Sequence, residues 1–334
     1  MKRLHQSVYY ATLFICFMLT ACSSGGNNAN APSSTPSSSP QAEAQDTSEP
    51  ESGNPYPVTI KHLKGEYTLE KKPEVIAVLD AKFADQLIAL EEKPAGSVKA
   101  AGSDTDFPEY LRDKLGDVKL LGTRDEPNLE AVLALQPDLI LMTDFQEAAY
   151  GNISKIAPTV VLDFDEDWRV TLETMGKIVG KQAQAKAVEQ AYEEKASKLK
   201  EQLAAKLGDE TVALIRPRTE GIRVHAPDHR TGAILYKDLG LNVPAFVAAA
   251  DDTSYEISLE AVSEIGADHY FLLSDAMFAD SVKELESTNI WKSLEPVKNN
   301  HAYKVDTTSW IAYYGPIANS MIIEQAAEAL LGKE

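Results

Sequence analysis

Short apolar runs alternate with amphipathic stretches along most of the chain, and this alternation predicts its architecture. Six runs are typical of buried strands, because each is short and rich in aliphatic residues. They lie at 75–79 (VIAVL), 138–142 (DLILM), 159–162 (TVVL), 211–215 (TVALI), 268–273 (DHYFLL) and 302–305 (AYKV). Stretches with helical spacing lie between them, at 83–90 (FADQLIAL), 128–135 (NLEAVLAL) and 257–265 (ISLEAVSEI). Strands that alternate with helices indicate parallel sheets built from α/β units.

An internal repeat indicates that the body of the chain is duplicated. Residues 128–143 align with residues 258–273 without a gap when the chain is shifted by 130 positions. Both segments have the pattern of a helix, a turn and an apolar strand, and Leu, Glu, Ala, Val and Asp coincide. We therefore expect two α/β lobes that each contain one such unit.

A long helix is predicted between the two halves, over residues 181–208. Gly180 is expected to end the preceding helix and Gly208 to end this one. About 25 helical residues at a rise of 1.5 Å span roughly 38 Å, which is enough to bridge two lobes. An ordinary surface helix is the alternative. The predicted fold is α/β, with two Rossmann-like lobes (58–180 and 209–334) joined by one long connecting helix.

The first 57 residues have a different composition and are not expected to belong to the fold. Residues 1–22 have a basic start, an apolar stretch and small residues before a cysteine, which is typical of a secretory signal. The apolar stretch is shorter than the roughly 20 residues of a membrane span. LTAC, ending at Cys22, resembles the bacterial lipoprotein box, in which the cysteine is diacylated; a plain secretory signal is the alternative. Residues 23–57, rich in Ser, Pro and Asn, predict a disordered tether.

Charge and motif content exclude several classes of function. The chain has 51 acidic against 32 basic residues and a formal charge of −19, so we expect neither nucleic acid nor anionic lipid headgroups as partners. The phosphate-binding and nucleophile motifs GxxxxGK[ST], GxGxxG and GxSxG are absent from the sequence. We therefore expect no enzyme and no cofactor.

The histidines favour a structural role over a metal site. His225 and His229 are close in sequence, but Pro227 between them is incompatible with the helical spacing of an HExxH-type site. Cys16 lies in the predicted signal and Cys22 is the predicted acylation site, so no thiol is left to bind zinc. A metal-dependent hydrolase or a direct metal carrier that uses the two histidines stays open as an alternative.

Arginines point to an anionic ligand. Arg216, Arg218 and Arg223 follow the predicted strand 211–215, and loops at the carboxyl ends of parallel strands line the ligand crevice of α/β proteins. Arginine is suited to bidentate recognition of carboxylates. The alternative is a solvated turn whose arginines balance nearby acids.

Aromatic residues near the C-terminus are expected to line the same crevice. Trp310, Tyr313 and Tyr314 precede a predicted C-terminal helix that begins near Gly315 and Pro316. We expect Trp310 and one tyrosine to face the crevice, and the alternative is that these rings fill the core of the second lobe.

Taken together, these features resemble the helical-backbone solute-binding proteins of bacterial ABC importers for iron–siderophores, haem and cobalamin. The resemblance covers roughly residues 58–334. Its most specific segments are GTRDEPNLEAVLALQPDLIL (122–141), SKIAPTVVLD (154–163), GIRVHAPDHRTGAILYKDLGL (221–241) and WKSLEPVKNNHAYKVD (291–306). It implies a lipid-anchored, non-enzymatic and monomeric receptor on the outer face of a single-membrane bacterium. Its partners would be the permease subunits and ATPase of an importer.

Within this family, the GTRxxPNLE motif is similar to that of members that carry citrate-containing or hydroxamate ferric siderophores. The resemblance implies that Arg124 meets an anionic chelate at the edge of the first lobe, with the other arginines approaching from the second. It also implies that Glu130 and Glu260, at matching positions of the repeat, dock onto arginines of the permease. Carboxylates in the first turn of a helix are favourable in any protein, which is the alternative for both glutamates.

The chain departs from the family at one position. Related members often have an Arg-His pair after the strand that corresponds to 138–142, and this chain has Gln146 and Glu147 instead. Lys82 is expected to compensate from a loop, and a solvated lysine is the alternative. The departure leaves the type of siderophore open, and haem or cobalamin stays open as a ligand because Tyr313 or Tyr314 is suited to be an axial ligand of haem.

Overall fold

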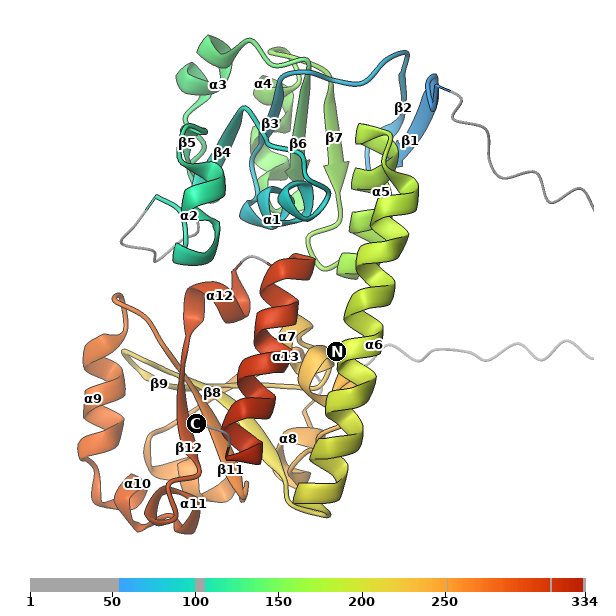
Figure 1. Cartoon of the computed structure of the whole chain (residues 1–334). Coiled ribbons are helices and arrows are strands. Elements are labelled where there is room, and N and C mark those ends of the chain that lie inside the picture. Colours follow the sequence, from blue (N-terminus) through green and yellow to red (C-terminus); the bar gives the residue numbers. More distant parts are fainter. Residues whose placement is uncertain (1–53, 100–105, 251, 313, 333–334) are drawn as a thin grey trace, which may run out of the picture. The chain divides into compact units, whose positions relative to one another are not determined.

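The chain folds around two five-stranded sheets, each covered by helices (Figure 1). The computed structural model describes residues 54–99, 106–250, 252–312 and 314–332. They begin with a two-stranded antiparallel hairpin, formed by β1 (Val58–His62) and β2 (Gly65–Leu69).

The sheet of the N-terminal lobe is parallel throughout, in the strand order β5-β4-β3-β6-β7. Its strands are β3 (Ile76–Val78), β4 (Gly96–Lys99), β5 (Lys119–Thr123), β6 (Leu139–Thr143) and β7 (Thr159–Leu162). The helices of this lobe are α1 (Ala81–Ala89), α2 (Glu109–Leu115), α3 (Leu129–Leu135), η1 (Asp144–Ala149), α4 (Tyr150–Ile153) and α5 (Trp168–Val179).

The sheet of the C-terminal lobe is mixed, in the order β10-β9-β8-β11-β12. Strands β8 (Val212–Arg218), β11 (His269–Ser274) and β12 (Ala302–Asp306) are parallel. Strand β9 (Gly221–His225) pairs in antiparallel fashion with β8 on one side and with β10 (Ser254–Ile257) on the other. The predicted strand 211–215 therefore continues to Arg218 and turns into a hairpin, where the sequence had indicated a loop.

The helices of the C-terminal lobe are mostly short. They are α7 (Arg230–Ala233), the π-helical turn η2 (Ile234–Asp238), α8 (Ala245–Ala248), η3 (Glu260–Glu264), α9 (Ala279–Ser287), α10 (Asn289–Ser293), α11 (Glu295–Lys298), α12 (Thr307–Ile311) and α13 (Pro316–Leu331). The helix expected at 257–265 is only the 3₁₀ turn η3, because β10 extends to Ile257 and Gly266 takes a left-handed φ of 64°. The repeat nevertheless holds at the level of the strands, since β6 and β11 each lie inside their sheet.

One long helix, α6 (Gln182–Leu207), connects the lobes (Figure 1). It follows α5 directly, because Gly180 takes a left-handed φ of 72° and ends that helix. Its apolar side packs against α5 and α13, with Tyr192, Ala196 and Leu203 buried. The predicted fold of two α/β lobes and a connecting helix is thus confirmed. In the described part of the chain, none of the helices combines the length and apolar character of a membrane span.

The two lobes share a hydrophobic core. One continuous cluster includes Phe83 and Leu141 of the N-terminal lobe, Leu203 of α6, and Ile322 and Phe271 of the C-terminal lobe. Separate clusters fill the far side of each sheet. Because α6 and α13 contribute to the shared cluster, the lobes cannot separate widely without exposing apolar surface to water.

Trp310 belongs to this core, and the expectation that it faces the crevice is wrong. Its side chain is fully buried, its ring centroid lies 4.9 Å from that of Phe271, and its Nε1–H donates to Oε1 of Gln325 at 2.7 Å. A large ring with a single donor is stabilised in a core where an acceptor meets that donor. Gln325 of α13 provides that acceptor, and the sequence had not linked these two residues.

We predict that Trp310→Ala lowers the free energy of unfolding by about 3–5 kcal/mol, because it leaves a cavity in the shared core. Trp310→Phe should cost less, since it keeps most of the volume and loses the bond to Gln325. Urea unfolding followed by circular dichroism measures both. A normal unfolding midpoint for Trp310→Ala would contradict this core assignment.

Candidate functional site

A cavity of about 390 Å³ lies between the two lobes. Asp80, Ala81, Arg124 and Asp125 line it from the N-terminal lobe, and the rest of the lining comes from the C-terminal lobe. Among the described residues of this lining are five arginines: Arg124, Arg216, Arg218, Arg223 and Arg230. In a chain with a formal charge of −19, this local excess of guanidinium groups is the main electrostatic feature of the cavity.

Arg124 reaches the cavity from a tight turn after β5. The Thr123 N–H donates to the Glu126 carbonyl at 3.2 Å, and the Glu126 N–H donates to Oγ1 of Thr123 at 3.0 Å. Gly122 precedes this turn with φ of 88°, and a Cβ there would lie 2.5 Å from the Glu126 oxygen. The turn therefore requires glycine and places Arg124 and Asp125 at its corner.

The turn is also supported from η1, by Gln146, one of the two residues at which the chain departs from the family. The side chain of Gln146 is buried, and its Nε2 donates to the carbonyl oxygens of Leu79 (2.8 Å) and Arg124 (3.1 Å). Glu147 instead points outward and pairs with Lys64. Gln146 thus positions Arg124, and Glu147 lies away from the cavity.

The β8–β9 hairpin contributes three arginines to the cavity. Arg216 pairs in register with Arg223 across the two strands, and Arg218 lies two residues after Arg216. Residues two apart in a strand project from the same face. His225, two residues after Arg223, joins this set, so a single face of the hairpin carries the cationic lining.

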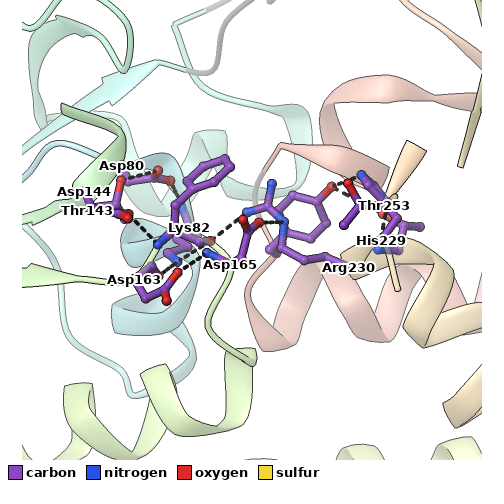
Figure 2. A network of polar contacts seen from close by, with 12 residues as sticks. Asp80, Lys82, Thr143, Asp144, Asp163, Asp165, His229, Arg230 and Thr253 are labelled. Atoms are coloured by element: carbon purple, nitrogen blue, oxygen red, sulfur yellow. Dashed lines mark hydrogen bonds and ion pairs between the residues drawn. The ribbon is translucent and has the colours of Figure 1, made fainter. Parts of the chain in front are cut away.

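Arg230, at the start of α7, is the arginine that sequence reasoning missed. Its guanidinium carbon lies 4.0 Å from the ring centroid of Phe164 and 3.8 Å from that of Tyr314. Its Nη1 donates to the Phe164 carbonyl at 3.0 Å, and its Nε lies 3.7 Å from Asp165 (Figure 2). Its position just after His229 gave no periodic signal, because its role depends on a loop 65 residues earlier in the chain.

The other arginines of the cavity are also held by carboxylates and rings. Arg216 donates to Asp275 at 2.7 Å and lies over Phe278, with 4.9 Å from its guanidinium carbon to the ring centroid. Arg218 and Arg223 share Glu256, at 3.0 and 3.1 Å. Arg124 lies 4.1 Å from the ring centroid of Phe145. These contacts limit the rotamers of the side chains and keep the charged groups directed at the cavity.

Several donors of this arginine set stay unsatisfied. The Nε atoms of Arg124, Arg216 and Arg223 are buried and have no hydrogen-bond partner within the described part of the chain. Leaving a buried donor unpaired costs about 1–3 kcal/mol, so an anionic acceptor in the cavity would be stabilising.

Two histidines lie at the base of the cavity, with ring centroids 4.2 Å apart. Nδ1 of His229 accepts the Thr231 N–H at 3.2 Å and caps α7, whereas both ring nitrogens of His225 lack a partner among the described residues. Burial lowers the pKa of both histidines, and the neighbouring arginines lower it further, so both rings are neutral at neutral pH. Across the described ranges, no group of three or more His, Cys, Asp or Glu is arranged to hold a metal ion.

The aromatic lining differs from the prediction. Tyr314 lines the cavity, Tyr313 lies outside the described residues, and Trp310 lies in the core. Met277 and Phe278 also line it and had not been predicted. Both residues follow β11 at its carboxyl end. Loops at the carboxyl ends of parallel strands line the ligand crevice of α/β proteins, so their position in the sequence could have indicated them.

Lys82 has a different role from the predicted one. It lies in the first turn of α1 rather than in a loop, it is buried, and its Nζ donates to the carbonyl oxygens of Asp163 (3.0 Å) and Phe164 (3.1 Å) (Figure 2). Burial lowers its pKa. Lys82 is not among the residues that line this cavity, and it orders the loop that contacts Arg230.

The predicted docking and anchoring residues lie elsewhere. Glu130, in the first turn of α3, and Glu260, at the start of η3, are exposed. Asn128 caps α3, since its side chain accepts the Ala131 N–H at 3.0 Å. Hydrogen bonds from its own backbone and from the Ser258 side chain lower the pKa of Glu260. Cys22 lies outside the described residues.

Comparisons with known proteins agree with this architecture. Residues 76–308 match the family described as periplasmic binding protein. The iron-uptake system-binding protein of Bacillus subtilis is 30% identical over 279 residues, which cover 81% of this chain and 86% of the relative. The Fe(3+) dicitrate-binding periplasmic protein FecB of Escherichia coli is 30% identical over 273 residues, covering 80% and 88%.

Solved structures extend the agreement to three dimensions. The crystal structure of Staphylococcus aureus SirA complexed with staphyloferrin B is similar with a TM-score of 0.73 and 28% identity, covering 82% of this chain and 98% of that one. The family resemblance of the sequence is therefore confirmed, and it concerns binding proteins rather than enzymes. With its two α/β lobes, its connecting helix and a family match over most of its length, the chain belongs to the periplasmic binding protein family.

Proposed function

We propose that this protein is the substrate-binding lipoprotein of an ABC importer and captures a ferric siderophore of the citrate or hydroxamate type. The observation that carries the proposal is the set of five arginines around a cavity between the lobes of an acidic chain. Net charge repels an anionic chelate, so its recognition requires such a local cationic site.

The chemistry of the lining supports an anionic, oxygen-rich ligand. Guanidinium groups donate paired hydrogen bonds to carboxylate and hydroxamate oxygens, and five such groups line the cavity. A volume of about 390 Å³ lies in the range of small-molecule sites. A relative named for Fe(3+) dicitrate supports the citrate type.

Apolar groups of the cavity would cover the carbon framework of the chelator. Phe278, Met277 and Ile311 line it beside the arginines. The iron is already coordinated by the chelator, so the protein itself does not ligate the metal. Tyr314 would be the axial ligand in a haem receptor, but its ring covers Arg230 and its hydroxyl lies 3.5 Å from both Thr231 and His229. This environment favours the siderophore over haem.

The remaining segments complete the proposed mechanism. Residues 1–22 direct secretion, Cys22 carries the lipid anchor on the outer face of the cell membrane, and residues 23–53 act as a tether. The tether was predicted to reach residue 57, but Tyr56 belongs to the body, since its hydroxyl donates to the Ile178 carbonyl at 2.6 Å. The lobes, at 58–180 and 209–334, are joined by the connecting helix at 181–208, and each presents one glutamate, Glu130 or Glu260, to the permease. Because the lobes share a core, only a small hinge motion accompanies binding.

We predict that Arg216→Ala and Arg124→Ala each weaken binding about tenfold or more, because each removes a charged hydrogen-bond donor. Fluorescence quenching of the full-length protein measures binding of ferric citrate, a ferric citrate-hydroxamate, a ferric trihydroxamate, a ferric catecholate and haem, each compared with its iron-free form.

Arg112→Ala is the matched control, because Arg112 is exposed on α2 and is not among the lining residues. It should leave binding unchanged. Wild-type affinity in both cavity variants, or saturation by haem alone, would refute the proposed site.

We also predict that the double variant Glu130→Ala, Glu260→Ala keeps ligand affinity and loses uptake of the ferric complex by cells. The matched control is Glu194→Ala with Glu201→Ala, which removes the same charge from exposed positions of α6. Uptake of iron-55 is measured in cells that express each double variant, and only Glu130→Ala, Glu260→Ala should lose it. Normal uptake by the first double variant would disprove the docking role.

A further inference from the structure

Asp85 of α1 lies where the two lobes meet, and its carboxylate is completely buried. Oδ1 accepts the Ile317 N–H at 3.0 Å, and Oδ2 accepts the Ala318 N–H at 2.9 Å and the Tyr110 hydroxyl at 2.8 Å. Burial raises the pKa of Asp85 to about 6, against the opposing effect of these hydrogen bonds, so the group is ionised at neutral pH. One carboxylate thus binds donors from both lobes.

Helix α13 has no side chain of its own that could cap its N-terminus. Its N-cap residue is Gly315, and the next residue, Pro316, has no N–H. The Asn319 N–H donates to the Gly315 carbonyl at 2.9 Å. The other free donors of the first turn are the N–H groups of Ile317 and Ala318, and Asp85 accepts both. A residue of the opposite lobe therefore performs the capping that a local Ser, Thr, Asp or Asn usually performs.

The contact is close enough to determine the residue at position 315. A Cβ on Gly315 would lie 2.0 Å from Oδ1 of Asp85 and 2.3 Å from its carboxyl carbon. Any side chain at 315 would force α1 and α13 apart. The glycine and the aspartate, more than 200 residues apart in the chain, are therefore required together.

The start of α13 also sets one wall of the ligand cavity. Tyr314, the residue before Gly315, has a φ of 40° and is buried against the guanidinium of Arg230. Arg230 in turn bonds to the Phe164 carbonyl of the N-terminal lobe. Asp85 and Arg230 thus each join the two lobes, and Tyr314 links these two contacts.

We propose that Asp85 is a positioning residue for the arginine cavity: by capping α13 from the opposite lobe, it holds Tyr314 and Arg230 in place. Asp85 itself is not among the lining residues of the cavity, so it acts through these two. The ligand-binding readout of this inference rests on the proposed function, whereas the readout from amide exchange does not.

The test uses Asp85→Asn in the full-length protein. The amide NH₂ of asparagine faces one of the two N–H donors, so the cap loses at least one charged hydrogen bond. Hydrogen exchange should show at least tenfold lower protection of the Ile317 and Ala318 amides, and reduced protection of the Ala233 amide in α7. The Arg169 amide of α5, which is capped within its own lobe by Asp167 at 2.8 Å, should keep its protection.

Binding gives the second readout. The probe is the ferric complex of the titration panel that wild type binds most tightly, with ferric citrate tried first. Asp85→Asn should weaken this binding about tenfold, although the substituted side chain lies outside the lining. If wild type binds no complex of the panel, the proposed function fails, and loss of protection in α7 still tests the positioning role.

Gly315→Ala provides an independent route to the same effect and covers the case in which Asp85→Asn does not fold. Gly315→Ala leaves the carboxylate of Asp85 intact but pushes it away from α13. It should therefore reproduce both the lower amide protection and the weaker ligand binding of Asp85→Asn. Gly151→Ala is the matched control, since a Cβ at Gly151 meets no atom within 4 Å. Gly151→Ala should change neither protection nor affinity.

Two outcomes would overturn the inference. Full protection of the Ile317 and Ala318 amides in both variants would show that Asp85 does not cap α13. Lost protection there with unchanged protection in α7 and unchanged affinity would show that the cap is purely local.

Discussion

The shared hydrophobic cluster is the constraint on which the rest of this structure depends. It joins one side of each sheet through α6 and α13, whereas the other sides have clusters of their own. Opening the lobes widely would expose this apolar surface, at roughly 25 cal/mol for each Å². The cavity between the lobes is consequently preformed, and a ligand need not supply the free energy of organising it.

Within this frame, an acidic chain builds a cationic cavity by pairing its charges locally. Arg216 is held by Asp275, whose side chain is almost fully buried, and Arg218 and Arg223 share Glu256. Each carboxylate orients a guanidinium and partly neutralises it. The ring of Phe278 then restricts Arg216 from one face, and the ring of Tyr314 does the same for Arg230, which leaves the remaining donors for a ligand.

The loop after β7 connects the two halves of the cavity. Lys82 donates to the carbonyl oxygens of Asp163 and Phe164, and Asp144 accepts the Phe164 N–H at 2.8 Å (Figure 2). This partly buried polar network fixes the ring and the carbonyl of Phe164, both of which contact Arg230. Lys82 of one lobe thereby orders Arg230 of the other through a loop that contacts both. The sequence alone does not reveal this link, because the three segments are far apart in the chain.

The amino-acid sequence by itself determined six of the strands (β3, β6, β7, β8, β11 and β12), the long helix at 181–208 and the grouping of arginines at 216–223. These features depend on local periodicity, on glycines such as Gly180, and on composition. Only the tertiary structure decided that Trp310 and Lys82 turn inward, that the segment after β8 is a hairpin, and that Arg230 joins the cavity. The physical reason is that each of these outcomes depends on a partner distant in sequence: Gln325 for Trp310, the Asp163–Phe164 carbonyls for Lys82, and Phe164 for Arg230.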